Sequence, residues 1–474
     1  MVEGEGSGGP FAVRGVIEGF YGNPWTHAQR LDLVRFIGQR GMNTFVYGPK
    51  DDLLVRRRWH EPYGAEALSR LDELVGVGAE VGVAIGYAIS PGLSIRYSSE
   101  ADRARLLSKL EQVADVGVTS FALLLDDLPP ALTHDEDRLA YADIAEAHAA
   151  LASAVATDIG SEQRLVVCPL VYHGRGDEPY LARLAATLDP RVDILWTGRS
   201  ICSPVLEADD ARRFIATAGR PPLYWDNYPV NDVAMIWELH IGPYQGRDVE
   251  LPAVSRGILA NPMELPEASK IPLATVADYL ADPEHYDPEM SLMRAIRQVA
   301  GDGSPDGGQD ASAFGMFSDN VRSSCLCEDD AITVTSTLFA FSVAADEAAE
   351  TGVVGRLHGA ATDLRGLSTQ LLTAADHLLR GEVANSTLID ECRPWIEAFE
   401  LGAAAMSRAA ELALDGHLPA DHERVATTLL PFLADLRRRR VRVFGDALDM
   451  FLAEMTDTHI RPGRLLPIDG GGDL

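Results

Sequence analysis

The sequence has few cysteines, no long apolar run and no visible leader. Its 474 residues include five cysteines, an odd and scattered set: Cys168, Cys202, Cys325, Cys327 and Cys392. Such a set indicates a reduced, intracellular setting rather than a disulfide framework. No stretch approaches the roughly 18 apolar residues of a membrane span. Because residues 1–10 lack the basic and apolar regions of a signal peptide, we expect a cytoplasmic protein.

Basic residues are also scarce. Lysine and arginine number 41 against 71 aspartate and glutamate residues, which gives a formal net charge of −30. Nucleic acids and anionic membrane surfaces bind basic footprints, so we expect neither as a partner. Motifs of the His-x-His or His-Glu-x-x-His kind are absent, and Cys325-Leu326-Cys327 lacks the spacing of a zinc knuckle. We therefore expect no metal and no other cofactor.

Apolar runs alternate with helical patterns eight times between Val13 and about Asp282. The apolar runs are Val13–Phe20, Asn43–Gly48, Glu80–Ile89, Ser120–Leu125, Leu165–Val171, Asp193–Trp196, Pro222–Trp225 and Gly257–Leu259. The helical patterns are His27–Arg40, Ala65–Val77, Ala101–Val116, Asp135–Thr157, Glu178–Leu188, Ala208–Ala218 and Glu267–Leu280. The seventh connection, Val230–Arg256, predicts an irregular segment or a short helix. Eight units over about 270 residues favour a (β/α)8 TIM barrel. A doubly wound open sheet is the alternative, disfavoured because a Gly-rich phosphate loop is missing.

The α/β barrel is followed by a region of different composition. We predict these regions: 1–12, a flexible N-terminus; 13–282, the barrel; 283–317, a connecting segment with a Gly-rich loop; 318–460, a helical domain; 461–474, a flexible tail. Long amphipathic patterns within 318–460 predict a C-terminal α-helical bundle. These patterns are Ile332–Glu350, Gly355–Arg380, Ile389–Asp415 and Asp421–Thr456.

Two adjacent carboxylates, Asp126 and Asp127, follow the apolar run Ser120–Leu125. A continuous apolar run of this length is typical of a strand that is buried on both faces, as in a parallel sheet. Residues after such a strand lie at the carboxyl edge of the sheet, where barrels keep their active sites. Aspartate after a strand is more often a helix cap or a turn residue. One cap needs only one carboxylate, so on this stretch alone both interpretations stay open.

The other predicted strands also end in polar or aromatic residues. These ends are Glu18–Gly22, Pro49–Asp52, Ser90–Gly92, Tyr172–Gly174, Thr197–Gly198, Trp225–Asn227 and Asn261–Pro262, with Asp232 close by. Aspartate, asparagine, tyrosine and lysine can bind hydroxyl groups, and aromatic rings can pack on apolar faces. Singly, each residue has an ordinary structural explanation. Together, they predict a site for a sugar.

Several of these segments resemble glycoside hydrolase family 84, the O-GlcNAcases and hyaluronidase-like β-N-acetylglucosaminidases. The matching segments, in the family's order, are Gly15–Trp25, Tyr47–Asp52, Tyr87–Gly92, Ser120–Asp127, Leu195–Gly198, Trp225–Asn227, Gly242–Tyr244 and Asn261–Pro262. The resemblance implies retaining hydrolysis of terminal β-linked N-acetylglucosamine by substrate assistance. In that mechanism the substrate's own acetamido oxygen attacks the anomeric carbon and forms an oxazoline, an exception to the two-carboxylate scheme.

The resemblance also implies roles for individual residues. Asp126 would orient the acetamide and stabilise the oxazolinium, and Asp127 would be the general acid/base. The residues implied to contact the sugar are Gly19, Lys50, Tyr172, Thr197, Trp225, Asn227, Asp232 and Asn261. Among them, Asp232 would bind the O4 and O6 hydroxyls and Tyr172 the acetamide or oxazoline oxygen.

Two other functions remain open from the residues alone. The barrel could belong to a sugar-binding or scaffold protein that does not turn over its ligand. Alternatively, Asp126, Asp127 and Asp226 could hold a divalent metal in a hydrolase, although no ligand motif supports this. The substrate is expected to be a glycoside or glycoprotein that bears N-acetylglucosamine. The natural aglycone is left open, and so is a homodimer.

Overall fold

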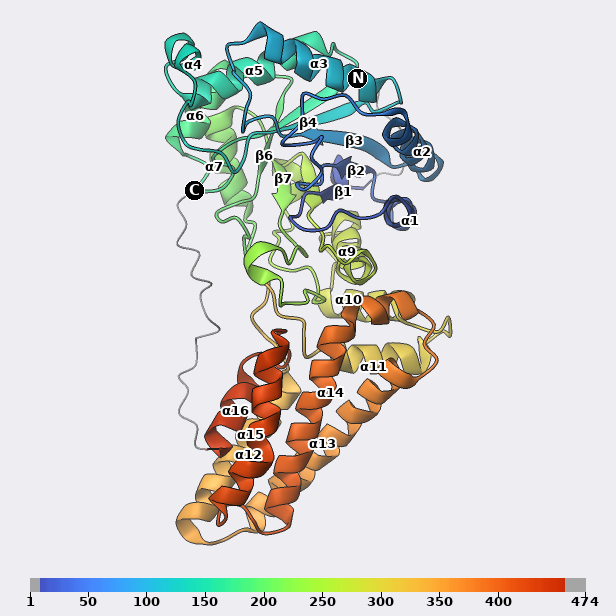
Figure 1. Ribbon diagram of the computed structural model, residues 1–474, viewed down its shortest axis with the longest axis vertical. Coiled ribbons are helices and arrows are strands. Elements are labelled where there is room, and N and C mark those ends of the chain that lie inside the picture. Colours follow the sequence, from blue (N-terminus) through green and yellow to red (C-terminus); the bar gives the residue numbers. More distant parts are fainter. Residues whose placement is uncertain (1–8, 457–474) are drawn as a thin grey trace. The chain divides into compact units, whose positions relative to one another are not determined.

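The computed structural model describes residues 9–456. Residues 1–8 of the predicted flexible N-terminus and the whole of the predicted tail, 461–474, lie outside this range. Eight parallel strands pair in chain order and close into a barrel (Figure 1). They are β1 Val13–Glu18, β2 Thr44–Tyr47, β3 Ala84–Ile89, β4 Ser120–Leu124, β5 Arg164–Cys168, β6 Asp193–Trp196, β7 Leu223–Asp226 and β8 Gly257–Ala260. The closed barrel confirms the predicted TIM fold and excludes the open sheet.

Side chains alternate between two apolar cores because successive residues of a strand point to opposite faces. One core includes Ile17, Val46, Leu124 and Leu259, together with Trp225. The neighbouring strand residues belong to a second, larger core that also takes in side chains of the surrounding helices. Both faces of each strand are therefore buried, which explains why the strands are continuous apolar runs in the sequence.

The helices after the strands are α1 His27–Gln39, α2 Ala65–Val81, α3 Glu100–Ala114, α4 Asp135–Ala140, α5 Ile144–Asp158, α6 Pro179–Thr187, α7 Ala208–Ala218, α8 Leu251–Val254 and α9 Pro266–Ala281. Local signals set their ends. Thr26 and Gln29 form a capping box at the start of α1, and Ser99 caps α3. Gly82 ends α2 in a left-handed conformation with φ of 73°. In the seventh connection a 3₁₀ turn, η1 Val233–Met235, and the short α8 confirm the predicted irregularity.

The predicted helix Asp135–Thr157 is wrong as a single element. The chain leaves helical geometry at Tyr141, and Asp143 then caps α5 by accepting a hydrogen bond from the Glu146 N–H at 2.9 Å. Asp137, which is fully buried in α4, accepts from the backbone of Tyr97 and Ser98. This tether fixes α4 on the loop after β3, so the two helices cannot align.

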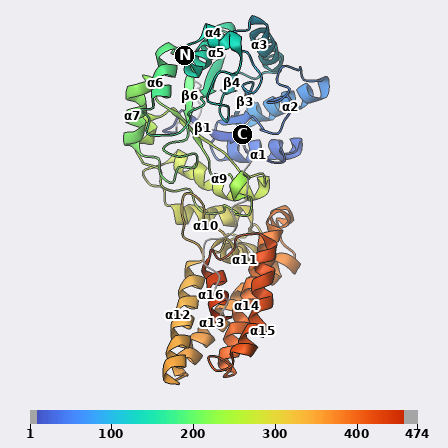
Figure 2. The same ribbon diagram turned by 60° about the vertical axis from the view of Figure 1, so that its left-hand side comes forward.

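Further helices follow the barrel: α10 Pro288–Val299, α11 Gly308–Ser318, α12 Ile332–Thr351, α13 Gly355–Arg380, α14 Ser386–Leu414, α15 His422–Arg439 and α16 Ala447–Met455. Helices α12 to α16 run alongside one another (Figure 2). The predicted helix Asp421–Thr456 is interrupted between α15 and α16, where Arg440 and Phe444 have left-handed φ values of 53° and 65°. There the Phe444 ring is buried and its N–H donates to the Asn320 carbonyl, so tertiary contacts replace helical ones.

The chain forms two compact units that are not contiguous in sequence. The barrel unit runs to Ile236 and also contains Pro243–Ala295 and the four residues Ser324–Cys327. The second unit takes Trp237–Gly242, Ile296–Ser323 and, within the described residues, 328–456. In residues 9–456 no helix combines the length and the apolar character that crossing a membrane requires.

Candidate active site

Asp126 and Asp127 lie just beyond β4 in different surroundings. Asp126 is buried, with 5% of its surface exposed, whereas Asp127 is an exposed residue. Asp127 has a left-handed φ of 54°, a conformation that costs a non-glycine residue about 1–3 kcal/mol. The turn gives the two adjacent carboxylates separate environments. Such strain persists only where the surrounding structure imposes it.

Asp126 carries one bonded oxygen and one open oxygen. Its Oδ2 forms an ion pair with the Lys50 ammonium group, which is itself buried. Its Oδ1 is buried and has no hydrogen-bond partner. Burial, the largest single influence, opposes the charge on Lys50, but the contacts with Asp126 and with further neighbours together raise the pKa of Lys50. The site therefore holds a charged pair with a free acceptor, which suits a ligand N–H.

Two tyrosine hydroxyls contact Asp127. Tyr21 donates to Oδ2 at 2.6 Å and Tyr172 donates to Oδ1 at 3.2 Å. Tyr21 in turn accepts a hydrogen bond from Arg56 Nη1 at 2.8 Å. Burial, followed for Tyr172 by the charge of Asp127, raises the pKa of both phenols, that of Tyr21 to about 12. Both phenols therefore keep their protons at neutral pH and act as donors.

Asp232 joins the same cluster through the backbone. Its Oδ2 accepts the Tyr21 N–H at 2.7 Å, so Tyr21 contacts both Asp127 and Asp232. Burial raises the pKa of Asp232. Two residues earlier than Tyr21, the Gly19 N–H donates to Asn261 Oδ1 at 3.2 Å. A Cβ atom on Gly19 would lie 2.3 Å from the Trp225 ring, so this close approach requires glycine.

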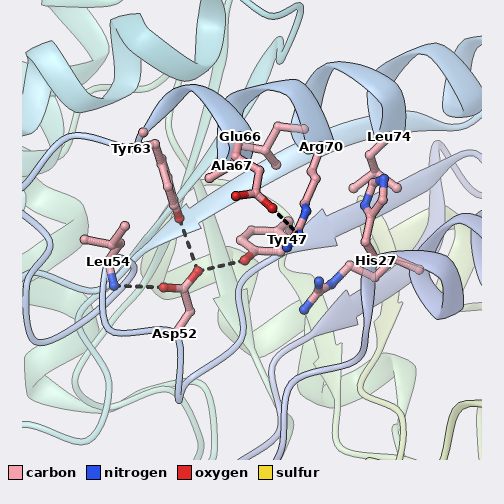
Figure 3. Close-up of a pocket in the computed structure, with 12 residues that line it drawn as sticks. His27, Tyr47, Asp52, Leu54, Tyr63, Glu66, Ala67, Arg70 and Leu74 are labelled. Carbon is pink, nitrogen blue, oxygen red and sulfur yellow. Dashed lines mark hydrogen bonds and ion pairs between the residues drawn. The ribbon is translucent and has the colours of Figure 1, made fainter.

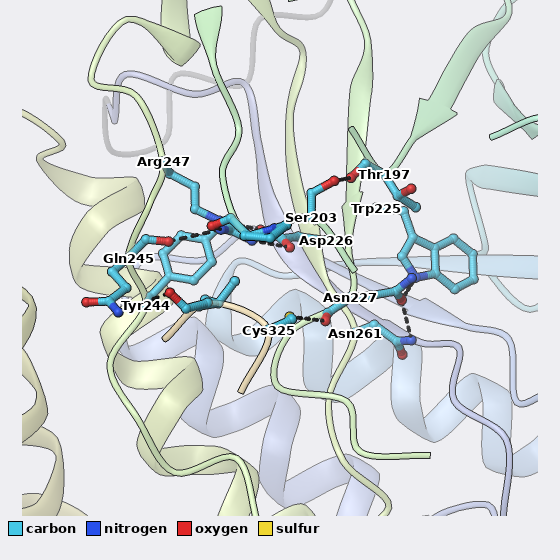
Figure 4. A network of polar contacts seen from close by, with 12 residues as sticks. Thr197, Ser203, Trp225, Asp226, Asn227, Tyr244, Gln245, Arg247, Asn261 and Cys325 are labelled. Carbon is cyan, nitrogen blue, oxygen red and sulfur yellow. Dashed lines mark hydrogen bonds and ion pairs between the residues drawn. The ribbon is translucent and has the colours of Figure 1, made fainter. Parts of the chain in front are cut away.

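Asn227 connects two other predicted residues, Trp225 and Asn261 (Figure 4). Its Oδ1 accepts from Trp225 Nε1 at 2.8 Å and from Asn261 Nδ2 at 2.9 Å. Its Nδ2 donates to the Ile201 carbonyl at 2.9 Å, which fixes the orientation of the amide. Thr197 differs, because its hydroxyl donates to the Ser200 carbonyl within its own loop at 2.7 Å. Its backbone N–H still tethers it to the Tyr172 carbonyl at 2.9 Å.

Asp226, the last residue of β7, is fully occupied by neighbours within the barrel unit. Arg247 binds it with two nitrogens at 2.6 and 2.9 Å, and the Tyr244 hydroxyl donates to it at 2.6 Å (Figure 4). Within residues 9–456 no group of three or more His, Cys, Asp or Glu side chains is arranged to hold a metal ion. The metal-hydrolase alternative therefore has no set of ligands in the described part of the chain.

The two residues after Lys50, Asp51 and Asp52, hold the loop that carries it. Asp51 accepts the Gly22 N–H at 2.9 Å. Asp52 accepts from the hydroxyls of Tyr47 at 2.7 Å and Tyr63 at 3.3 Å. Tyr47, Asp52 and Tyr63 line a cavity of about 430 Å³ between α1 and α2 (Figure 3). The contacts hold Asp51 and Asp52, the two residues after Lys50, and so help to place its ammonium group beside Asp126.

The structure thus gathers the predicted residues into connected groups. Lys50 contacts Asp126, Tyr172 contacts Asp127, and Gly19, Asn261, Asn227 and Trp225 form one chain of hydrogen bonds and ring contact. Sequence reasoning did not single out Tyr21, Arg56 or Arg247. Tyr21 lies in a quoted strand end and could have been chosen there. Arg56 and Arg247 lie in irregular connections that carry no signal.

Chemically, the cluster combines a buried carboxylate that has a free acceptor with an exposed carboxylate that two phenols orient. The first can polarise an N–H, and the second can exchange a proton with a bound ligand. Lys50, Asn261 and Asp232 add donors and acceptors for hydroxyl groups, and the Trp225 ring adds an apolar wall.

Known proteins resemble the chain in sequence and in structure. A family profile described as beta-N-acetylglucosaminidase matches residues 14–319. The protein O-GlcNAcases of Mus musculus and Rattus norvegicus are 33% and 34% identical to the chain over 284 and 271 residues. These matches cover 59% and 56% of this chain but only 31% and 29% of the two relatives, so the chain spans about a third of their length. A variant of the O-GlcNAc hydrolase of Thermobaculum terrenum has a solved structure with a TM-score of 0.87 at 33% identity, covering 94% of this chain and 95% of that one.

Proposed function

Because the chain belongs to the β-N-acetylglucosaminidase family, glycoside hydrolase family 84, we propose that it removes terminal β-linked N-acetylglucosamine from O-glycosides. The reaction proceeds with retention, through an oxazoline formed by the substrate's own acetamido group. The observation that carries the proposal is the buried, unpartnered Oδ1 of Asp126 beside the exposed Asp127. A pure sugar-binding protein has little use for an exposed carboxylate aligned by two phenols.

In the first step Asp126 Oδ1 accepts the acetamide N–H, which makes the acetamido oxygen more nucleophilic. That oxygen forms a bond to the anomeric carbon while the bond from this carbon to the glycosidic oxygen breaks. Asp127 gives its proton to the departing oxygen. Lys50 compensates the charge of Asp126 in a place where an isolated carboxylate would be costly.

In the second step the oxygen of a water molecule forms a bond to the anomeric carbon while the bond from this carbon to the acetamido oxygen breaks, which opens the oxazolinium ring. Asp127 accepts the proton of the water, and the acetamide is restored. We assign Asn261, Asp232, Lys50 and the backbone of Gly19 to the sugar hydroxyls. Trp225, Asn227, Tyr172 and Thr197 are assigned to the acetyl group. The hydrogen bonds of Asn227 with Trp225 and Asn261 support a single continuous site, since they link the two sets.

The names of the relatives are the basis for our proposal of the natural aglycone. Relatives bear the names protein O-GlcNAcase and O-GlcNAc hydrolase, so we place a serine- or threonine-linked N-acetylglucosamine of a polypeptide first. A panel of glycopeptides, chitobiose and muropeptide fragments at one enzyme concentration ranks the classes. A preference for chitobiose would reject the polypeptide assignment.

The reaction itself is tested with an aryl N-acetyl-β-glucosaminide and its N-trifluoroacetyl analogue. We expect turnover of the first and a much slower reaction of the second, because fluorine withdraws electrons from the attacking oxygen. Absence of turnover would support the alternative function, a sugar-binding protein that does not hydrolyse its ligand. A rate indifferent to the fluorines would reject substrate assistance. Loss of activity with a chelator would return the metal hydrolase to consideration.

A further inference from the structure

Arg56 is one of three consecutive arginines, and its surroundings differ from those of the other two. Arg57 is exposed, and Arg58 is exposed and pairs with Glu61 on the surface. Arg56 is half-buried, donates from Nη1 to the Tyr21 hydroxyl at 2.8 Å, and has its guanidinium carbon 5.4 Å from the centre of the Tyr21 ring. The guanidinium therefore makes a cation–π contact with the Tyr21 ring and also hydrogen-bonds to its oxygen.

Tyr21 links Arg56 to Asp127 through two hydrogen bonds of its hydroxyl group. Its oxygen accepts from Arg56 and its O–H donates to Asp127 Oδ2 at 2.6 Å. A phenol that accepts a hydrogen bond from a cation becomes a stronger donor, because hydrogen bonds in a chain polarise one another. Burial keeps the Tyr21 proton in place by raising the pKa of Tyr21 to about 12. The chain thus ends in a strengthened donor aimed at a carboxylate oxygen.

We propose that Arg56 is a positioning residue that acts through Tyr21 to orient Asp127 and to stabilise the negative charge that Asp127 acquires when it gives up its proton. The inference rests on the proposed function, in which Asp127 is the acid/base. As the proton moves from Asp127 to the glycosidic oxygen, the carboxylate left behind receives the Tyr21 O–H. Strengthening that hydrogen bond makes Asp127 a better proton donor to a poor leaving group.

The test compares Arg56→Gln with Arg58→Gln, a matched loss of charge two residues away and outside the site. Rates are measured on a serine-linked glycopeptide and on an activated aryl glycoside over a range of pH. Arg56→Gln is expected to lower kcat/KM about tenfold on the glycopeptide and about twofold or less on the aryl glycoside, since hydrogen bonds to charged groups are worth roughly a factor of ten or more. The alkaline limb of its pH profile moves to higher pH. Arg56→Lys, which keeps the charge, recovers part of the loss.

A second variant separates this relay from a structural role. Tyr21→Phe removes the hydroxyl that joins Arg56 to Asp127. Adding Arg56→Gln to Tyr21→Phe is expected to change the glycopeptide rate no further, because the two residues act in series. Additive losses, equal losses on both substrates, or an unmoved alkaline limb would each overturn the relay. Inhibition by free N-acetylglucosamine is expected to stay at the wild-type level in Arg56→Gln. The proposed function fails separately, if the wild-type enzyme does not turn over the aryl glycoside.

Discussion

A buried aspartate lies at the end of β7 and another just beyond the end of β4, and each is paired with a buried cation. The two pairs differ in whether a carboxylate oxygen is left without a partner. Asp226 receives two nitrogens of Arg247 and the hydroxyl of Tyr244. Asp126 receives Lys50 on one oxygen, and its other oxygen is buried without a partner. A buried acceptor without a partner costs about 1–3 kcal/mol of stability. The difference indicates that the Asp226 pair stabilises the fold, whereas the Asp126 pair keeps one oxygen available to bind a ligand.

Removing Asp126 tests whether its pair with Lys50 serves the reaction rather than the fold. Asp126→Ala is expected to lower kcat/KM about a thousandfold on both the glycopeptide and the aryl glycoside, since the oxazolinium loses its stabilising charge whatever the leaving group. Rates are measured per folded molecule, because Lys50 loses its partner. Asp193→Ala, at the amino end of β6, is the control and should change the rate less than about twofold. A loss of tenfold or less in kcat/KM for Asp126→Ala would indicate that the Asp126 pair, like the Asp226 pair, serves the fold rather than the reaction.

Asp127 sharpens the comparison because its carboxylate is neither buried nor paired with a cation. Asp127→Asn is expected to lose about 10²–10⁴ in kcat/KM on the glycopeptide, where a proton must reach the leaving oxygen. The activated aryl glycoside needs little proton donation and should lose far less. Steady-state rates on the two substrates measure the split. Equal losses would assign Asp127 to binding and would reject it as the acid.

The barrel could be predicted from the sequence because each strand is a local apolar run that is buried on both faces. We also predicted that the ends of different strands lie near one another, as the contacts of Lys50 with Asp126 and of Gly19 with Asn261 illustrate. The left-handed turn at Asp127 was not predictable, because it depends on its neighbours rather than on aspartate itself.

The partners of these residues could not be predicted for a related reason. Arg56 and Arg247 lie in irregular connections, and the way those segments close, rather than any periodic pattern, decides which carboxylate or phenol each guanidinium meets. The break between α15 and α16 has the same origin. The N–H groups of Arg442 and Phe444 donate to the carbonyls of Trp237 and Asn320, residues far away in the sequence.

Removing Arg247 tests the other member of the comparison. Arg247→Met is expected to lower the free energy of unfolding by about 3–5 kcal/mol, because Asp226 is left buried with an uncompensated charge. Thermal or denaturant unfolding measures the loss. Arg256→Met, which removes an exposed partner of Asp193, is the control and should cost less than about 1 kcal/mol. If Arg247→Met instead retains its stability and loses turnover per folded molecule, the Asp226 pair serves the reaction rather than the fold.

The smallest expected effect separates charge from packing at Asp226. Tyr244→Phe removes one hydroxyl donor at 2.6 Å but leaves both Arg247 nitrogens on the carboxylate. We expect a loss of about 2 kcal/mol in the free energy of unfolding, less than for Arg247→Met, because a hydrogen bond to a charged group is worth about 1.5–3 kcal/mol. Tyr279→Phe is the matched control, since the Tyr279 hydroxyl donates at 2.8 Å to the backbone carbonyl of Asp248, which carries no charge. For this variant we expect a loss of about 1 kcal/mol in the free energy of unfolding. If the two phenylalanine variants lose equal stability, the charge of Asp226 contributes nothing through Tyr244, and Arg247 alone accounts for the difference between the two pairs.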